Sequence, residues 1–545
     1  MNRRTPTPEQ ALAIEAGGHD VLVEAGAGTG KTGVMVDRYC RLVCELEAPA
    51  DAVLAFTFTD KAATELRRRI RTALELRAAD GSQRARELLG AIGGAWVTTI
   101  HGFCNRLLAG HPVAVGIDPR FRVLDGPEAE RAAREAFDDA LAEFLAGGEE
   151  ARERTVAAFE IGGLRAIVSG VHAELRSRGM VTPRLPELPI PVPEAAVRRA
   201  AEVARETIEE LKPTNSNREL VERARAVLGA VDLPDLDELV ALRTDSKAKS
   251  MTAYREAIEA AVAQVAEAGE GGEAYRHIAE LLELFSRRYG AAKERRDGLD
   301  FEDLQLRAVG LLEREEIGNA YRARFSHLLV DEFQDTNRLQ LRLIEALRGP
   351  RTELMVVGDE LQSIYGFRHA DLDVFREQRQ AVEASADAIA MELSGNFRSR
   401  PEVIGAVNSI GEKLLGDAFR PLRAGAPPEL PEPPGEGPAV ELLLTARDGW
   451  DTAGIDLAPA TDADTPPSHL AEARFVAERL RELAESGVER GEMVVLLRAF
   501  THLDAYEDSL ERAGLRPYTI GGRGYWSQQQ VADVCALLAT IANPL

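Results

Sequence analysis

The sequence Val21-Leu-Val-Glu-Ala-Gly-Ala-Gly-Thr-Gly-Lys-Thr32 decides the fold of this chain. An apolar run that enters a glycine-rich turn and ends in Lys-Thr predicts a strand, a phosphate-binding loop and the start of a helix. The glycines let backbone N–H groups surround phosphate oxygens. Lys31 can reach the β- and γ-phosphates of a nucleoside triphosphate, and the Thr32 hydroxyl can bind Mg²⁺. The strict pattern has glycine where Ala25 stands, so the rest of the chain must support this prediction.

The chain around this loop predicts an α/β fold. Residues 1–115 alternate strands (20–24, 52–57, 95–99) with helices (from 30, and 60–76), which is typical of a parallel sheet with crossover helices. The phosphate loop then follows the first strand, at the carboxyl end of the sheet, where such sheets bind ligands. A chain of 545 residues with 45% apolar content can form roughly three or four domains.

Helical periodicity replaces this alternation between residues 116 and 298, and helices are expected at 128–144, 195–211 and 273–288. Strand patterns return at 326–331 and 354–358, so residues 299–386 are expected to complete the first domain. A further, partial domain is expected over 387–545, with a proline-rich linker at 421–467. Its predicted elements are helices 470–485, 503–513 and 528–542, a strand at 493–497, and Gly514 ending the second helix.

Composition excludes several classes of protein. A formal charge of −24 argues against gripping a polyanion with the whole surface, so any nucleic-acid groove must be local or based on aromatic stacking. The chain has no apolar run of membrane-spanning length and no signal-peptide pattern, which favours a cytoplasmic protein without a membrane partner. Cys40 and Cys44 lie one helical turn apart, a spacing that suits two metal ligands but also one apolar helix face.

A second block, 327–336, ends an apolar run in Asp331-Glu332. One carboxylate there can hold Mg²⁺, and the other can orient or deprotonate an attacking water. Such a pair at a strand end is common by itself. Beside a phosphate loop it predicts hydrolysis of a nucleoside triphosphate.

Two further blocks follow, each with two interpretations. In 355–368, Gln362 occupies the position of a γ-phosphate sensor, while Tyr365 and Phe367 are either core residues or, beside Arg368, a platform on which bases stack. In 393–401, Arg398 is either a surface arginine or a cation that reaches the γ-phosphate from a second domain. Gln10 is either solvated or reads an adenine edge.

Together these blocks resemble the UvrD/Rep helicases of superfamily 1, and most closely the AddA/RecB-like branch of helicase-nuclease subunits. The motifs occur in family order at 7–10, 25–32, 57–66, 99–104, 331–336, 357–368 and 393–400. The family tolerates alanine at position 25. The resemblance implies a RecA-like motor domain split by the helical insertion, followed by an incomplete second RecA-like domain.

The resemblance also implies site residues. The ATP-binding residues would be Gln10, Ala25, Gly26, Ala27, Gly28, Thr29, Gly30, Lys31, Thr32 and Phe397. Thr32 and Asp331 would hold Mg²⁺. The catalytic residues would be Lys31, Asp331, Glu332 as the base, Gln362 and Arg398 as an arginine finger. Single-stranded DNA would contact Thr57, Phe58, His101, Tyr365, Phe367 and Arg368.

By this resemblance the chain would use ATP and Mg²⁺ to move 3′ to 5′ on single-stranded DNA and act at junctions with duplex. Recombinational repair is the expected pathway, and a nuclease is a possible partner. The family's last two motor motifs and a nuclease carboxylate set are not found. An ATP- and DNA-binding module that does not unwind alone therefore stays open as an alternative. A small-molecule kinase with a phosphate loop is disfavoured, because the insertion and the aromatic residues would have no role in it.

Overall fold

The computed structural model describes residues 5–187, 193–211, 217–244, 246, 248–425, 438–446, 465–520 and 529–542. The chain forms two compact units. The first comprises Met1–Gly26 and Gly30–Leu393, and the second comprises Ala27–Thr29 and Ser394–Leu545. The expected α/β class with a parallel sheet is confirmed by the first unit.

The first unit contains one six-stranded sheet in the order β3-β2-β6-β7-β1-β8. Every pairing is parallel. The strands are β1 (Asp20–Ala25), β2 (Val53–Thr57), β3 (Trp96–Thr99), β6 (His327–Val330), β7 (Glu353–Gly358) and β8 (Ala388–Leu393). Residues on both sides of the helical insertion therefore build one sheet.

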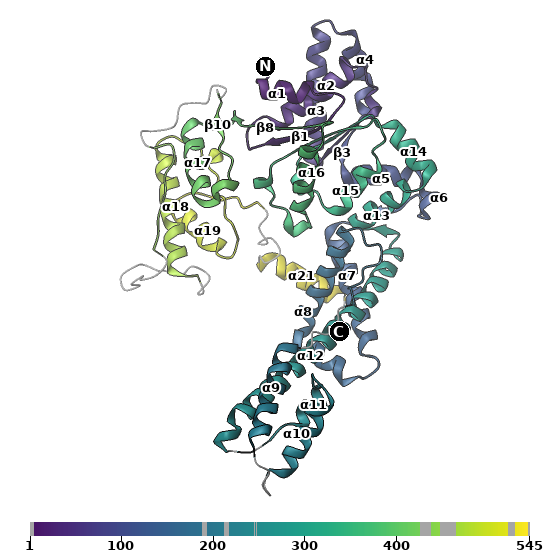
Figure 1. Ribbon diagram of the computed structural model, residues 1–545. Helices are drawn as coiled ribbons and strands as arrows, with labels where there is room; N and C mark the ends of the chain where they lie inside the picture. Colours follow the sequence, from purple (N-terminus) through teal and green to yellow (C-terminus); the bar gives the residue numbers. More distant parts are fainter. Residues whose placement is uncertain are drawn as a thin grey trace. The chain divides into compact units, whose positions relative to one another are not determined.

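Both faces of the sheet are covered, as their nearly continuous apolar sequences require. Val21 and Val23 of β1 point into one apolar cluster, while Leu22 points into the other. Figure 1 shows α2 and α3 on one side of the sheet and α15 and α16 on the other. The helices of this part are α1 (Pro8–Glu15), α2 (Lys31–Cys44), α3 (Asp60–Ala79), α4 (Gln83–Ala91), α5 (Ile100–Gly110), α6 (Pro112–Val115), α13 (Phe301–Leu312), α14 (Glu315–Arg324), α15 (Arg338–Ala346) and α16 (Leu372–Ala384).

The cysteines of α2 belong to one of these clusters. Cys40 is fully buried in it, and Cys44 packs against its edge. Among the described residues there is no group of three or more His, Cys, Asp or Glu side chains arranged to hold a metal ion. The apolar interpretation of the Cys40 and Cys44 spacing therefore accounts for both side chains.

The insertion is helical. Its helices are α7 (Gly126–Leu145), α8 (Glu150–Ser177), α9 (Glu194–Glu210), α10 (Arg218–Ala230), α11 (Leu236–Ala241) and α12 (Thr252–Glu294). The 43-residue α12 contributes to two separate apolar clusters, one with α7 and α8 and one with α9 to α11. A short parallel pair, β4 (Arg122–Val123) with β5 (Gly298–Leu299), closes the base of the insertion.

Of the helices in the described part of the chain, α8 alone is long and apolar enough to cross a membrane. That helix is interrupted at Glu160, whose backbone leaves the helical region (φ 57°, ψ 153°). Glu174 and Arg176 in its last turn form ion pairs with the sheet domain. These features are those of a packed helix in a globular domain.

The second unit differs from the sequence-based expectation in two places. Residues 388–393 were expected to open it, but β8 pairs along its whole length with β1 of the first sheet. The strand expected at 493–497 is wrong, because these residues have no strand partner among the described residues and expose Val494 and Leu496. An apolar alternation becomes a strand only where another strand accepts its hydrogen bonds.

The described elements of the second unit are mostly helical. They are α17 (Pro401–Leu415), α18 (Pro467–Glu485), α19 (Leu503–Arg512), α21 (Gln529–Ala542) and a two-residue parallel pair of β9 (Gly395–Asn396) and β10 (Arg423–Ala424). Gly514 has φ 75° just after α19, as expected of a glycine that ends a helix. Most of the linker expected at 421–467 lies outside the described residues.

Candidate functional site

The order of the sheet brings three predicted residues together. β1, β7 and β6 are neighbours, and their carboxyl ends lead to Lys31, Gln362 and Glu332 respectively. The Lys31 ammonium lies 2.9 Å from Glu332 Oε2 and 3.4 Å from Gln362 Oε1. Residues more than 300 positions apart in sequence therefore meet at the first turn of α2.

The loop before α2 has the backbone geometry that its glycines allow. Gly28 and Gly30 have φ of 73° and 91°, which side-chain-bearing residues rarely adopt. A Cβ at position 30 would lie 2.9 Å from Gln10 Nε2. Gln10 is held beside the loop by a reciprocal capping box, in which Thr7 N donates to Gln10 Oε1 and Gln10 N donates to Thr7 Oγ1.

The acidic pair has unequal environments. Burial, with the neighbouring Glu332 charge, raises the pKa of Asp331 to about 6, although Lys31 partly opposes this shift. Glu332 adopts a left-handed backbone (φ 50°) that turns its side chain to Lys31. A buried carboxyl group that is reluctant to ionise fits a divalent cation, which would favour its charged form. Mg²⁺ commonly uses only one or two protein ligands besides phosphate and water, and Asp331 and Thr32 suit that role.

We expect Asp331→Asn to stabilise the nucleotide-free protein at about pH 8. The folded state raises this pKa from 3.8 to about 6, so it binds the proton more tightly than the unfolded chain does. The ionised carboxyl group therefore destabilises the fold, and the loss sets in as pH rises through that interval. Removing the charge should raise the free energy of unfolding by about 1 to 3 kcal/mol. Urea denaturation measures this difference.

The pH series supplies the control for this prediction. Near pH 4 the wild-type carboxyl group is protonated in the folded protein, so the advantage of Asp331→Asn should vanish. The exposed Asp139 of α7 provides the matched substitution, Asp139→Asn, which should have no such pH-dependent effect. An advantage for Asp331→Asn that stays equal at acidic and alkaline pH would contradict the proposed cause.

Gln334 organises the acidic pair, although it was not among the residues predicted from sequence. Its buried carboxamide donates to Glu332 Oε2 at 2.9 Å and accepts from Asp359 N at 3.0 Å. Asp359 Oδ2 in turn accepts a hydrogen bond of 2.6 Å from Gln362 Nε2. The end of β6 is thereby connected to the turn that follows β7. A glutamine two residues after an acidic pair was visible in the sequence, but only the fold reveals its partner.

A cavity of about 610 Å³ extends from this network along the sheet edge. We call it the groove. One part of its lining is acidic, with Asp331, Glu332 and Asp335, and another contains Thr57, Phe58, His101, Phe367 and Arg368. Five of the six residues expected to contact DNA thus line the same cavity as the acidic pair.

The sixth, Tyr365, packs on the Phe58 ring at a centroid distance of 4.5 Å. The Arg368 guanidinium lies 5.5 Å from the Tyr365 ring centre and 5.8 Å from that of Phe367. Phe367 is 76% exposed, which is unusual for a phenylalanine and is not explained by packing in the first unit. An exposed ring beside an arginine can stack on a base.

The opposite wall contains two residues that were not predicted. Phe301 at the start of α13 is 45% exposed and meets His101 edge to face at 4.8 Å. Gln305 Nε2 donates to His101 Nε2 at 3.2 Å and to Phe301 O at 3.1 Å. Burial lowers the pKa of His101 to about 4, so its ring is neutral at pH 7. The sequence signal was the segment 299–304, whose apolar and acidic residues alternate.

In the second unit, Asn396 holds both the phosphate-loop residues and the predicted arginine. Its buried carboxamide donates to Ala27 O at 2.7 Å and accepts from Arg398 N at 2.9 Å. Phe397 N donates to Gly28 O at 2.8 Å, and a Cβ at Gly28 would lie 2.8 Å from Arg398 Cβ. Phe397 and Arg398 therefore lie against the loop residues Ala27–Thr29, and Arg398 is exposed.

Comparison with known proteins decides the family. The UvrD/REP helicase N-terminal domain family matches residues 6–383, which is more than half of the chain. This chain belongs to the UvrD/REP helicase family. The suspected resemblance is thereby confirmed, and the phosphate loop, the acidic pair and the groove all lie within the matched residues.

Relatives with a similar sequence have one name in common. An ATP-dependent helicase/nuclease subunit from Bacillus mycoides (strain KBAB4) is 27% identical over 99% of this chain and 51% of its own length. The proteins of the same name from Bacillus cereus (strain AH820) and Bacillus anthracis are each 26% identical with the same coverage. This UvrD/REP family chain therefore spans about half the length of the curated relatives it matches.

Proposed function

We propose that this chain is the motor portion of an ATP-dependent DNA helicase that moves 3′ to 5′ along single-stranded DNA and acts at junctions with duplex. The observation that supports this most strongly is the groove, in which the acidic pair and the exposed aromatic residues share one cavity. The relatives are named as helicase/nuclease subunits, which favours a nuclease partner and a role in recombinational repair of DNA.

In the proposed cycle, ATP draws Lys31 away from Glu332, because phosphate oxygens compete for the ammonium group. Mg²⁺, held by Thr32 and Asp331, would supply charge compensation for the phosphates. Glu332, still held by Gln334, can then orient and deprotonate the attacking water. Arg398 stabilises charge on the γ-phosphate, Gln10 binds the adenine edge and Phe397 stacks near the base.

The same network couples hydrolysis to DNA. Lys31 contacts Gln362, and Gln362 is bonded through Asp359 to Gln334. Only two residues separate Gln362 from Tyr365, so a change at the phosphates shifts the turn that bears Tyr365 and Phe367. Bases stacked on these rings would move with it.

Streptavidin displacement from biotinylated oligonucleotides tests this function. We expect ATP-dependent displacement from the 5′ end and little from the 3′ end, because movement is proposed to run toward the 5′ end. Phe367→Ala should weaken single-stranded DNA binding, since stacking on one aromatic ring contributes roughly 1 to 3 kcal/mol per base. Phe475→Ala, at the 51% exposed phenylalanine of α18, is the control. Preferential displacement from the 3′ end would refute the polarity, and ATP turnover that does not respond to DNA would refute the motor.

A second candidate is an ATP- and DNA-binding module that does not unwind alone. It is favoured by the second unit, whose described residues include no strand longer than two residues and expose Val494 and Leu496. A strand-displacement assay on forked duplexes separates the two. Robust unwinding by this chain alone excludes the second candidate, while DNA-stimulated ATP turnover without unwinding supports it.

A further inference from the structure

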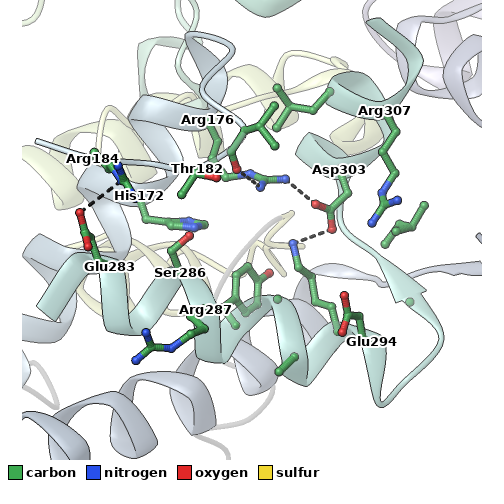
Figure 2. Close-up of a pocket in the computed structure, with 18 residues that line it drawn as sticks. His172, Arg176, Thr182, Arg184, Glu283, Ser286, Arg287, Glu294, Asp303 and Arg307 are labelled. Atoms are coloured by element: carbon green, nitrogen blue, oxygen red, sulfur yellow. Dashed lines mark hydrogen bonds and ion pairs between the residues drawn. The ribbon is translucent and has the colours of Figure 1, made fainter. Parts of the chain in front are cut away.

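The last turn of α8, in the helical insertion, reaches the sheet domain next to the groove. Arg176 forms an ion pair with Asp303 of α13, and Figure 2 shows this contact beside a hollow of about 810 Å³. Lys293 of α12 lies 2.5 Å from both Asp300 Oδ2 and Asp303 Oδ2. All four side chains are about nine-tenths buried, so solvent screens their attraction little.

The two carboxylates in this cluster also form the N-terminal cap of α13. Asp300 Oδ1 accepts from Asp303 N at 2.7 Å, and Asp303 Oδ2 accepts from Asp300 N at 3.2 Å. The first residue of α13 is Phe301, and Gln305 follows one turn later, both on the groove wall. Two cations of the insertion therefore fix the end of the helix that carries this wall.

A second contact of the same turn reaches another wall of the groove. Glu174 Oε2 lies 2.7 Å from His369 Nδ1. His369 closes the turn that bears Phe367 and Arg368, with its N–H donating to Gly366 O at 2.9 Å and a left-handed backbone (φ 62°). Arg178 is the other charged group that faces Glu174, at 2.8 Å.

Helix stability alone does not explain Glu174. A carboxylate in the last turn of a helix is unfavourable in the field of the helix dipole. Its contacts with His369 and Arg178 offset that penalty. Two residues later, Arg176 bears the charge that this end of a helix favours, and it too contacts the sheet domain instead of solvent.

We propose that the last turn of α8 is a positioning element for DNA, in which Glu174 and Arg176 hold the His369 turn and the α13 wall at a fixed separation across the groove. The proposal rests on the proposed function, because it assumes that the groove binds single-stranded DNA. It assigns the helical insertion a role in DNA affinity through residues that do not contact the nucleic acid themselves.

Glu174→Gln tests the proposal, because Arg176 is buried and its loss would leave Asp303 short of a partner. The change keeps the size of the side chain but removes its charge. We expect single-stranded DNA affinity, measured by fluorescence anisotropy with oligo-dT, to fall about three- to tenfold. The KM for ATP, turnover without DNA and the melting temperature should not change. Glu150→Gln, at the other end of α8 where Glu150 pairs only locally with Arg154 among the described contacts, is the matched control.

A double-mutant comparison shows whether Glu174 acts through the aromatic turn. In a Tyr365→Ala background, Glu174→Gln should weaken DNA binding further by less than about twofold, because the turn it positions has lost its ring. Full additivity, or an unchanged affinity for Glu174→Gln alone, would overturn the proposal. If Tyr365→Ala itself leaves DNA affinity intact, the groove is not the DNA path and the proposed function fails first.

Discussion

Lys31→Ala is expected to reduce DNA-stimulated ATP turnover by a factor of about 10³ or more. The Lys31 ammonium lies 2.9 Å from Glu332, at the end of the phosphate loop, so it is the cation placed to meet charge that develops on the γ-phosphate. The loss should appear mainly in kcat, because the backbone of the loop still binds the phosphates. A coupled ATPase assay at saturating single-stranded DNA measures it.

Lys413→Ala is the matched control, since this lysine is exposed on α17 in the second unit. It should retain wild-type turnover and a wild-type melting temperature. Full activity of Lys31→Ala would show that the nucleotide is hydrolysed elsewhere in the chain.

Glu332→Gln is expected to separate ATP binding from hydrolysis. The amide keeps the hydrogen-bonding size of the side chain but cannot take a proton from water, so the rate of the chemical step should fall by roughly 10² to 10⁴. ATP affinity should hold or rise, because Lys31 no longer has a carboxylate that competes with phosphate. Single-turnover hydrolysis and binding of a fluorescent ATP analogue measure the two effects independently.

Glu345→Gln on the exposed face of α15 is the control and should leave both quantities unchanged. Loss of ATP binding in Glu332→Gln, or hydrolysis at the wild-type rate, would contradict the assignment of Glu332 as the base.

The parts of the fold that were predictable from sequence depend on local patterns. An apolar strand followed by Gly-rich sequence and Lys31 specifies its own turn, and Asp331-Glu332 follows a strand that is buried on both faces. Because the carboxyl ends of parallel strands meet at one sheet edge, the approach of Lys31 to Glu332 was also predictable. The sheet order that makes β1, β7 and β6 neighbours supplied the reason.

What was missed depends on partners distant in sequence. Gln334, Asn396 and Gln305 are polar residues whose hydrogen bonds reach Asp359, Ala27 and His101 respectively. A glutamine or asparagine in a sequence does not indicate which backbone or ring it will bond. The contact between Glu174 and His369 spans 195 positions and was equally invisible.

The two wrong assignments have a common physical cause. Residues 388–393 and 493–497 both have apolar strand patterns, but the pattern does not specify a partner strand. β8 found one in β1 and joined the first sheet, whereas residues 493–497 found none among the described residues. Strand propensity reflects packing on neighbours more than an intrinsic preference of the backbone.

The central claim is that the loop at Lys31 and the acidic pair form one Mg²⁺–ATP site. A crystal structure of this chain with Mg²⁺ and a non-hydrolysable ATP analogue tests it most directly. The account predicts the γ-phosphate at Lys31 and the metal ion between Thr32 and Asp331, with Glu332 facing the γ-phosphate. A nucleotide bound elsewhere, or a metal ion that contacts neither Thr32 nor Asp331, would contradict it.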